Sequence, residues 1–281
     1  MNEAVSGHGV FIYNAKATID RYGSAALVAK ALKECGMRHA WVRIHGATET
    51  HVSVPTLPLI KTLQDEGISV AGWGWCQGNN IGLEVELALT ALVKFQLDDY
   101  VADIEDGVHG ANWTKAEIRK FFTSLRASLP SVSRVGLSTF GFIPWHKPEL
   151  MKAANEFVDF FAPQVYWFFF PNTKMLKELK TTPSNFPLDD SSSYTKLCIK
   201  AWQETVSKPL VVTGQAYWGE AQSYTDSVAE MKLSEFIQGF DGWEKIKGLN
   251  WWHMGGKDQK AMSFGMYQAL KAARLNEKFG H

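Results

Sequence analysis

The sequence predicts a single α/β domain, a (β/α)8 TIM barrel that spans residues 1–281 and carries a long loop after its sixth strand. Short apolar runs alternate with longer amphipathic segments along the whole chain, and eight such pairs can be counted. Strict alternation implies parallel strands with right-handed crossovers, and eight of them close into a barrel. The hydrophobic fraction of 46% is sufficient for a full core.

Each short apolar run predicts a strand, and each amphipathic segment predicts a helix. The predicted strands cover residues 9–15, 39–45, 69–76, 100–105, 134–140, 161–167, 209–217 and 249–253. The predicted helices cover 24–35, 56–66, 83–95, a segment from 114 onward, 148–157, 193–206, 228–240 and 262–274. Thr114 and Glu117 have the spacing of a capping box. An open doubly wound sheet is the alternative, but no glycine-rich phosphate turn follows the first strand.

Composition and charge exclude several function classes. Lys and Arg total 29, as do Asp and Glu, so a nucleic-acid binder or a polybasic membrane anchor is not expected. No apolar stretch of about 18 residues predicts membrane insertion, and the first residues do not form a signal peptide. We therefore expect synthesis in the cytoplasm. Cys35, Cys76 and Cys198 lack paired ligand spacing, so we expect reduced thiols, no bound metal and no cofactor.

The strongest candidate for chemistry is the acidic cluster at the end of the fourth predicted strand. Asp103 and Glu105 are two residues apart and therefore share a face of the strand, among apolar neighbours. Two carboxyl groups in one semi-enclosed site tend to have their pKa values pushed apart, leaving one protonated and one ionised. Cleavage of a glycosidic bond needs one protonated carboxyl group and one ionised carboxylate. Alternatively, one carboxylate pairs with Arg43 or a backbone amide and only holds the barrel rim.

Other strand ends supply polar and aromatic companions for this cluster. Aromatic residues make up 13% of the chain, with 11 Trp, which fits either a sugar-stacking cleft or ordinary core filling. The segment 168–192 would lie on the C-terminal face of the barrel, as binding loops do. His45 and His253 have the alternative reading of hydrogen-bonded rim residues. The candidates are Tyr166 as a catalytic residue and, for substrate binding, Asn14, Arg43, His45, Trp75, Gln77, Gln164, Trp167, Gln215, Tyr217, Trp251 and His253.

Three strand ends resemble those of barrel glycoside hydrolases. The Asp-x-Glu ending of residues 100–105 is similar to that of family 25 lysozyme-like muramidases, as is the aromatic ending at 251–253. Residues 163–167 resemble a strand of chitinase-like barrels that carries a Tyr at this point. The resemblance implies Glu105 as general acid and Asp103 as its partner. The muramidases have an Asp at the end of strand one, where this chain has Asn14. That departure favours a substrate-assisted route, with Asp103 orienting the acetamido nitrogen and Tyr166 contacting its oxygen.

The leading hypothesis is a hydrolase of an N-acetylated polysaccharide, above all the glycan strands of peptidoglycan. We expect a monomer with a polysaccharide as its partner, released by lysis or by a secretion or tail machine. One alternative is a barrel that binds a glycan or a protein without turnover. Another is a metal-assisted barrel hydrolase, because a barrel can collect ligands from separate strands. A serine triad lacks support, since no G-x-S-x-G occurs.

Overall fold

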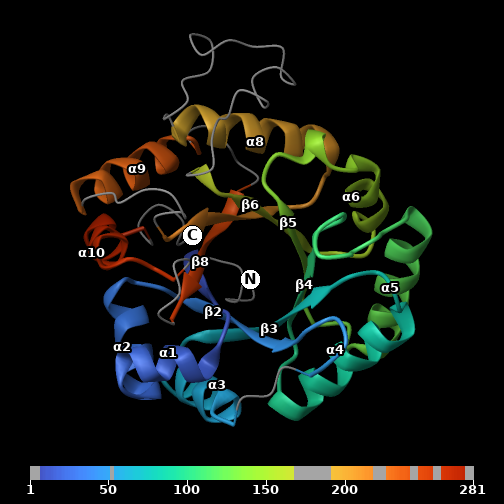
Figure 1. Cartoon of the computed structure of the whole chain (residues 1–281), viewed down its shortest axis with the longest axis horizontal. Coiled ribbons are helices and arrows are strands. Elements are labelled where there is room, and N and C mark those ends of the chain that lie inside the picture. Colours follow the sequence, from blue (N-terminus) through green and yellow to red (C-terminus); the bar gives the residue numbers. More distant parts are fainter. Residues whose placement is uncertain are drawn as a thin grey trace.

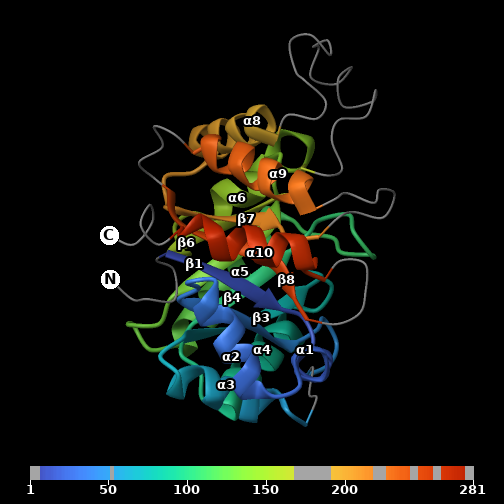
Figure 2. The same ribbon diagram turned by 90° about the vertical axis from the view of Figure 1, so that its left-hand side faces the viewer.

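The computed structural model describes residues 7–50, 54–167, 191–217, 226–240, 246–255 and 261–275. Eight parallel strands form a closed barrel in sequence order, and the helices form a ring around it (Figure 1). Figure 2 shows the helices flanking the barrel from the side. The predicted (β/α)8 fold is therefore confirmed. The predicted loop after the sixth strand lies almost wholly outside the described residues.

The strands have short, mostly buried sequences. They are β1 (Gly7–Ile12), β2 (His39–His45), β3 (Ser69–Cys76), β4 (Tyr100–Ile104), β5 (Val135–Phe140), β6 (Phe160–Val165), β7 (Leu210–Gln215) and β8 (Ile246–Met254). The helices are α1 (Ala15–Tyr22), α2 (Ala25–Glu34), α3 (Thr56–Asp65), α4 (Ile81–Phe95), α5 (Lys115–Ser128), the 3-10 turn η2 (Ile143–Trp145), α6 (Pro148–Ala154), α8 (Ser191–Thr205), α9 (Asp226–Gln238) and α10 (Phe264–Ala273). Among these helices none is long and apolar enough to cross a membrane.

The first strand–helix unit differs from the prediction. The strand ends at Ile12 rather than near Ala15, and the short helix α1 follows at once. Asn14 is the N-cap of α1, and its side-chain oxygen accepts a hydrogen bond from the Ala17 amide at 3.0 Å. The helix ends at Gly23, whose left-handed backbone is easy for glycine. Helix α1 has only eight residues, fewer than the amphipathic segments from which the other helices are predicted, so the sequence pattern missed it.

Aromatic side chains fill the barrel interior. Phe11 packs edge-on against Trp41 and Trp73, with ring centroids 5.0 and 5.5 Å apart. Trp41 also contacts Phe160, and the Trp73 indole donates a hydrogen bond to the Ile12 carbonyl at 3.3 Å. The interior is thus a packed core, as in other barrels of this kind. Much of the Trp content serves this core and the surrounding layer: Trp41, Trp73, Trp113, Trp202 and Trp251 are fully buried.

Candidate functional site

The acidic cluster lies at the C-terminal mouth of the barrel, where barrel enzymes have their active sites. Asp103 is the penultimate residue of β4 and is 5% exposed. The Gln164 side-chain amide on β6 donates to Asp103 Oδ1 at 2.9 Å and to Ser138 Oγ at 3.1 Å. Ser138 on β5 is the register partner of Asp103. Three adjacent strands thus hold one buried carboxyl group in a fixed position.

The two carboxyl groups of the cluster differ in burial, and this affects the pKa of Asp103. Burial raises the pKa of Asp103 well above its usual range, and the negative charge of Glu105 raises it further. Hydrogen bonds from Ser138 and Gln164 and the charge of Arg43 oppose this rise but do not cancel it. Glu105 itself is half-buried just beyond the strand. The proton is therefore held more tightly by the buried Asp103 while Glu105 carries its negative charge nearby.

Two tyrosines stand beside this pair. The rings of Tyr166 and Tyr217 meet edge to face with centroids 6.1 Å apart. Burial raises the pKa of Tyr166 well above its usual range, with further contributions from Tyr217, Glu105 and Asp103. Tyr166 therefore remains a neutral phenol that can donate a hydrogen bond. The Gln215 side chain is fully buried and donates to the Tyr217 carbonyl at 3.2 Å.

The opposite side of the mouth carries a cation over aromatic rings. The guanidinium of Arg43 lies 4.8 Å from the ring centre of Tyr13 and 5.6 Å from that of Trp73. Trp75 on β3 is the register partner of Asp103 and is half-buried. The Tyr13 ring is 5.6 Å from the buried His253. The structure thus places Arg43, Trp75 and His253 at the mouth, together with Tyr13, which sequence reasoning missed.

His45, a predicted substrate-binding residue, does not join this group, although a strict period of two would place it on the same face as Arg43. The β2–β3 register shifts between these two residues, so the strict alternation of faces is broken there. His45 Nε2 lies 2.7 Å from the Tyr100 hydroxyl and Nδ1 lies 2.8 Å from the Gly46 carbonyl. Burial lowers the pKa of His45 to about 4. His45 is thus a neutral, hydrogen-bonded residue behind the mouth.

Two of the predicted stacking tryptophans belong to the outer core instead. Trp251 is fully buried, and its indole donates to His8 Nδ1 at 3.2 Å. The ring of Trp167 packs on Phe236 of α9 with centroids 4.5 Å apart. Their predicted contact with substrate is therefore corrected. Trp252 is the residue of β8 that packs against the interior aromatic cluster, next to Phe11 at 5.3 Å.

Two other predicted binding residues have structural partners. The Asn14 side-chain oxygen is used as the N-cap of α1. The Gln77 amide donates to the His109 carbonyl at 2.7 Å and so supports the loop after β4. The side chains of both residues therefore fix the backbone at the ends of β1 and β4.

Sequence reasoning also missed a small hollow next to the acidic cluster. Its volume is about 140 Å³, and it opens between the ends of β5 and β6. Phe140 ends β5, and the residues that follow it turn back as η2. The aromatic residues that follow the fifth predicted strand are the sequence feature that could have indicated this hollow. The lining includes Phe140, Phe142, Trp145, His146, Gln164 and Tyr166.

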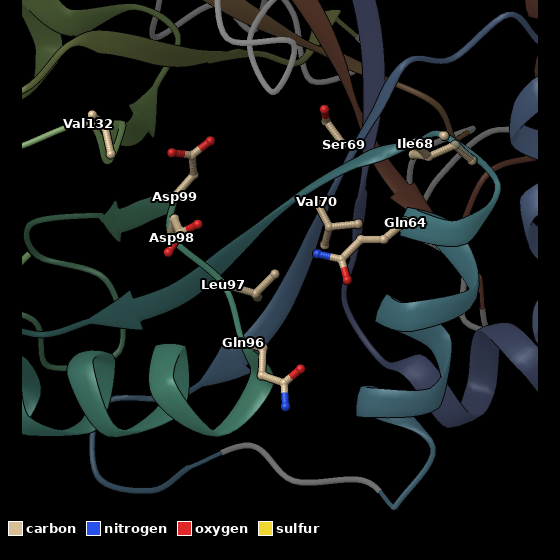
Figure 3. A pocket seen from close by; sticks show the side chains of 10 residues that line it. Gln64, Ile68, Ser69, Val70, Gln96, Leu97, Asp98, Asp99 and Val132 are labelled. Carbon is tan, nitrogen blue, oxygen red and sulfur yellow. The ribbon is translucent and has the colours of Figure 1, made fainter. Parts of the chain in front are cut away.

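A larger hollow of about 440 Å³ lies at the opposite end of the barrel (Figure 3). It is lined by polar residues at the N-terminal ends of β3 and β4, among them Ser69, Asp98 and Asp99. Asp99 accepts a hydrogen bond from the Arg134 amide at 2.7 Å. This end of a barrel supports the fold rather than the chemistry.

Within the described part of the chain, no three His, Cys, Asp or Glu residues gather as metal ligands.

No protein-family model matches the sequence, and no curated protein sequence matches it either. Solved structures do match the fold. The endo-1,4-beta-mannanase of Rhizomucor miehei aligns with a TM-score of 0.64 at 10% identity, over 99% of this chain and 96% of that one. The Bacillus cereus spore cortex-lytic enzyme SleL gives 0.59 at 10% identity, over 94% and 73%. The GH18 chitinase ChiB of Flavobacterium johnsoniae gives 0.55 at 10%, over 95% and 93%. At this identity the likeness establishes a shared barrel fold, and these neighbours are barrel glycoside hydrolases.

Proposed function

We propose that the protein is a glycoside hydrolase of an N-acetylated polysaccharide, with the glycan strands of peptidoglycan as its substrate. The observation that carries the proposal is the pair Asp103 and Glu105 at the barrel mouth, one carboxyl buried and the other half-buried. Such a pair divides one proton between two groups, which glycosidic cleavage requires. The cell-wall-lytic and chitin-degrading neighbours agree with this substrate class.

Glu105 is the proposed general acid because it is the more exposed carboxyl and faces the mouth that a glycan would enter. In the free protein the raised pKa of Asp103 favours the proton on Asp103. A sugar that covers Glu105 removes water from its carboxyl group and favours the neutral form there. Asp103 would then carry the negative charge, held by the Gln164 amide and Ser138.

Digestion of purified cell wall tests the proposal. The wild-type protein should release new reducing ends, and Glu105→Gln should lower the rate by about 10²–10⁴-fold, the usual contribution of a general acid. Glu86→Gln is a matched control, because Glu86 is an exposed carboxylate on α4. An absence of new reducing ends with the wild type, or equal release by Glu105→Gln, contradicts the proposal.

A second candidate is a barrel that binds a glycan without turnover. It is favoured by Asn14, which stands where the muramidases carry an Asp and whose side chain is used as a helix cap. Calorimetry with glycan fragments separates the two functions. Binding that is unchanged by Glu105→Gln, with no product from the wild type, supports the binding protein.

A further inference from the structure

The barrel mouth carries a guanidinium on the side away from Gln164 and Tyr166. Arg43 lies on β2 two residues after Trp41, a member of the interior cluster, and therefore faces the inside of the barrel. Its guanidinium makes cation–π contacts with Tyr13 and Trp73, which hold the charged group among aromatic rings.

Most of the hydrogen-bond donors of Arg43 have no acceptor in the described part of the protein. Its one hydrogen bond there runs from Nε to the His45 carbonyl at 3.5 Å. Neither terminal nitrogen donates to a described residue, and no described carboxylate forms an ion pair with Arg43. Gly46 leaves room beside the guanidinium, because a Cβ atom there would lie only 3.1 Å from Nη2. The N–H groups of both terminal nitrogens are therefore available to a ligand.

The positive charge of Arg43 is only partly hydrated and is not neutralised by Asp103. The Arg43 side chain is half-buried, and removing a charge from water without a partner is unfavourable. Its charge acts on Asp103, but burial keeps the pKa of that carboxyl group raised, so Asp103 stays protonated in the free protein. An anion that binds at Arg43 would supply the missing counter-charge.

We propose that Arg43 binds a carboxylate of the substrate, namely the lactyl carboxylate of a muramic acid residue. The terminal nitrogens donate hydrogen bonds to the two carboxylate oxygens, and the lactyl methyl contacts the exposed part of the Tyr13 ring. This inference rests on the proposed function, since it supposes that the acidic pair meets a peptidoglycan strand. Arg43 would then distinguish the muramic acid residues of the strand from the N-acetylglucosamine residues, which have no lactyl group.

The charge and shape of the site favour a carboxylate over other sugar substituents. A planar guanidinium donates two parallel hydrogen bonds to the two oxygens of a carboxylate. A phosphate monoester carries nearly two negative charges, and a single guanidinium would leave about half of that charge uncompensated. A neutral hydroxyl accepts a hydrogen bond but leaves the charge of Arg43 without a counter-charge.

The proposal also places the protein in a reaction sequence. In an intact strand the lactyl carboxyl group forms an amide bond with the peptide, and an amide carries no charge. The carboxylate is exposed only after hydrolysis of that amide bond. An amidase reaction therefore supplies the form of the strand that Arg43 recognises, and the bare strand is the preferred substrate.

The test compares three tetramers with the same β-1,4 backbone and the same N-acetyl groups. They are the tetramer of N-acetylglucosamine, the alternating tetramer of N-acetylglucosamine and N-acetylmuramic acid, and this second tetramer with its lactyl carboxyl groups converted to primary amides. Binding is measured by calorimetry near neutral pH in a Glu105→Gln background, so that no ligand is cleaved. A charge-assisted hydrogen-bonded pair at a half-buried site contributes about 20-fold, so the acidic tetramer should bind about 20-fold more tightly than either neutral one. Adding Arg43→Gln should reduce this preference to less than about 2-fold.

The matched control removes the same positive charge elsewhere. Lys33 lies in the last turn of α2 and is exposed, so Lys33→Gln should leave the preference unchanged. The preference is a ratio within one variant, so partial unfolding cancels. If Arg43→Gln does not fold, the comparison of the acid with its amide still decides the question, because it needs no change at Arg43.

Three results would overturn the inference: equal affinity for the acidic tetramer and its amide, a preference that survives Arg43→Gln, or no binding of any tetramer. An Arg43-dependent preference in a protein that releases no reducing ends from cell wall refutes only the hydrolase. Cleavage of cell wall without this preference refutes only the role of Arg43.

Discussion

Gly74→Ala is predicted to be strongly destabilising, because the glycine leaves room for the His45 ring. A Cβ atom at position 74 would overlap Nε2, Cε1 and Cδ2 of His45. Restoring van der Waals contact requires the ring to withdraw by about 1.5 Å. That movement breaks the 2.7 Å hydrogen bond between His45 and the Tyr100 hydroxyl, and both side chains are fully buried.

The expected loss has two parts. Overpacking a buried site costs about 1–3 kcal/mol, and leaving a buried polar group unpaired costs about 1–3 kcal/mol. The free energy of unfolding should therefore fall by about 4 kcal/mol, a large share of the roughly 5–15 kcal/mol of a typical domain. Urea unfolding followed by Trp fluorescence measures this loss as a lower midpoint with an unchanged slope.

Two comparisons isolate the steric cause. Gly67→Ala is the matched control, because its Cβ would meet nothing within 4 Å, and only its positive φ of +78° is unfavourable, by about 1 kcal/mol. In a His45→Ala background the ring is gone, so Gly74→Ala should cost less than about 1 kcal/mol there. A loss below about 1 kcal/mol in the wild type, or the same loss with and without the His45 ring, would refute the reasoning.

Three further predictions follow from hydrogen bonds at other sites. Gln164→Leu removes a donor from Asp103, which disfavours the ionised form and raises the pKa of that carboxyl further, so the alkaline limb of the pH–rate profile, on which the pair loses its last proton, should move to higher pH; an unmoved limb contradicts the role of Gln164. Arg126→Ala loses bonds to two carbonyls and to Asp159 at 2.7 Å and should lower the free energy of unfolding by about 2 kcal/mol, measured by urea unfolding; a change under roughly 0.5 kcal/mol would argue against it. Thr114→Ala removes the capping box of α5 and should cost about 1 kcal/mol in the same assay, whereas an unchanged midpoint would mean that the cap is not needed.

The strand–helix order could be predicted from the sequence because it depends on local patterns. Apolar runs of strand length and amphipathic segments recur in the observed order, and the capping box at Thr114 is present as expected. Helix α1 was missed because it has only eight residues and its cap, Asn14, gives a weak signal. The acidic cluster was found because carboxyl groups among buried neighbours at a strand end are rare.

The composition of the mouth could be predicted only in part. A period of two assigns residues to two faces, but it does not say which face is inside. In β8 the residue that packs against the interior cluster is Trp252, whereas Trp251, the predicted substrate contact, is bonded to His8 in the outer layer. In β2 a register shift removes His45 from the face of Arg43. Both outcomes depend on pairing with neighbouring strands, which the local sequence does not contain.

The sequence by itself determined the barrel order and the position of Asp103 and Glu105 at the end of the fourth strand, since periodicity and strand length are local properties. Tertiary structure alone decided that Gln164, 61 residues further along the chain, holds Asp103, and that Phe140 and His146 form a hollow beside it. The physical reason is barrel closure. It fixes strand register and bulges, and these determine which side chains face the mouth and how far each carboxyl group is removed from water.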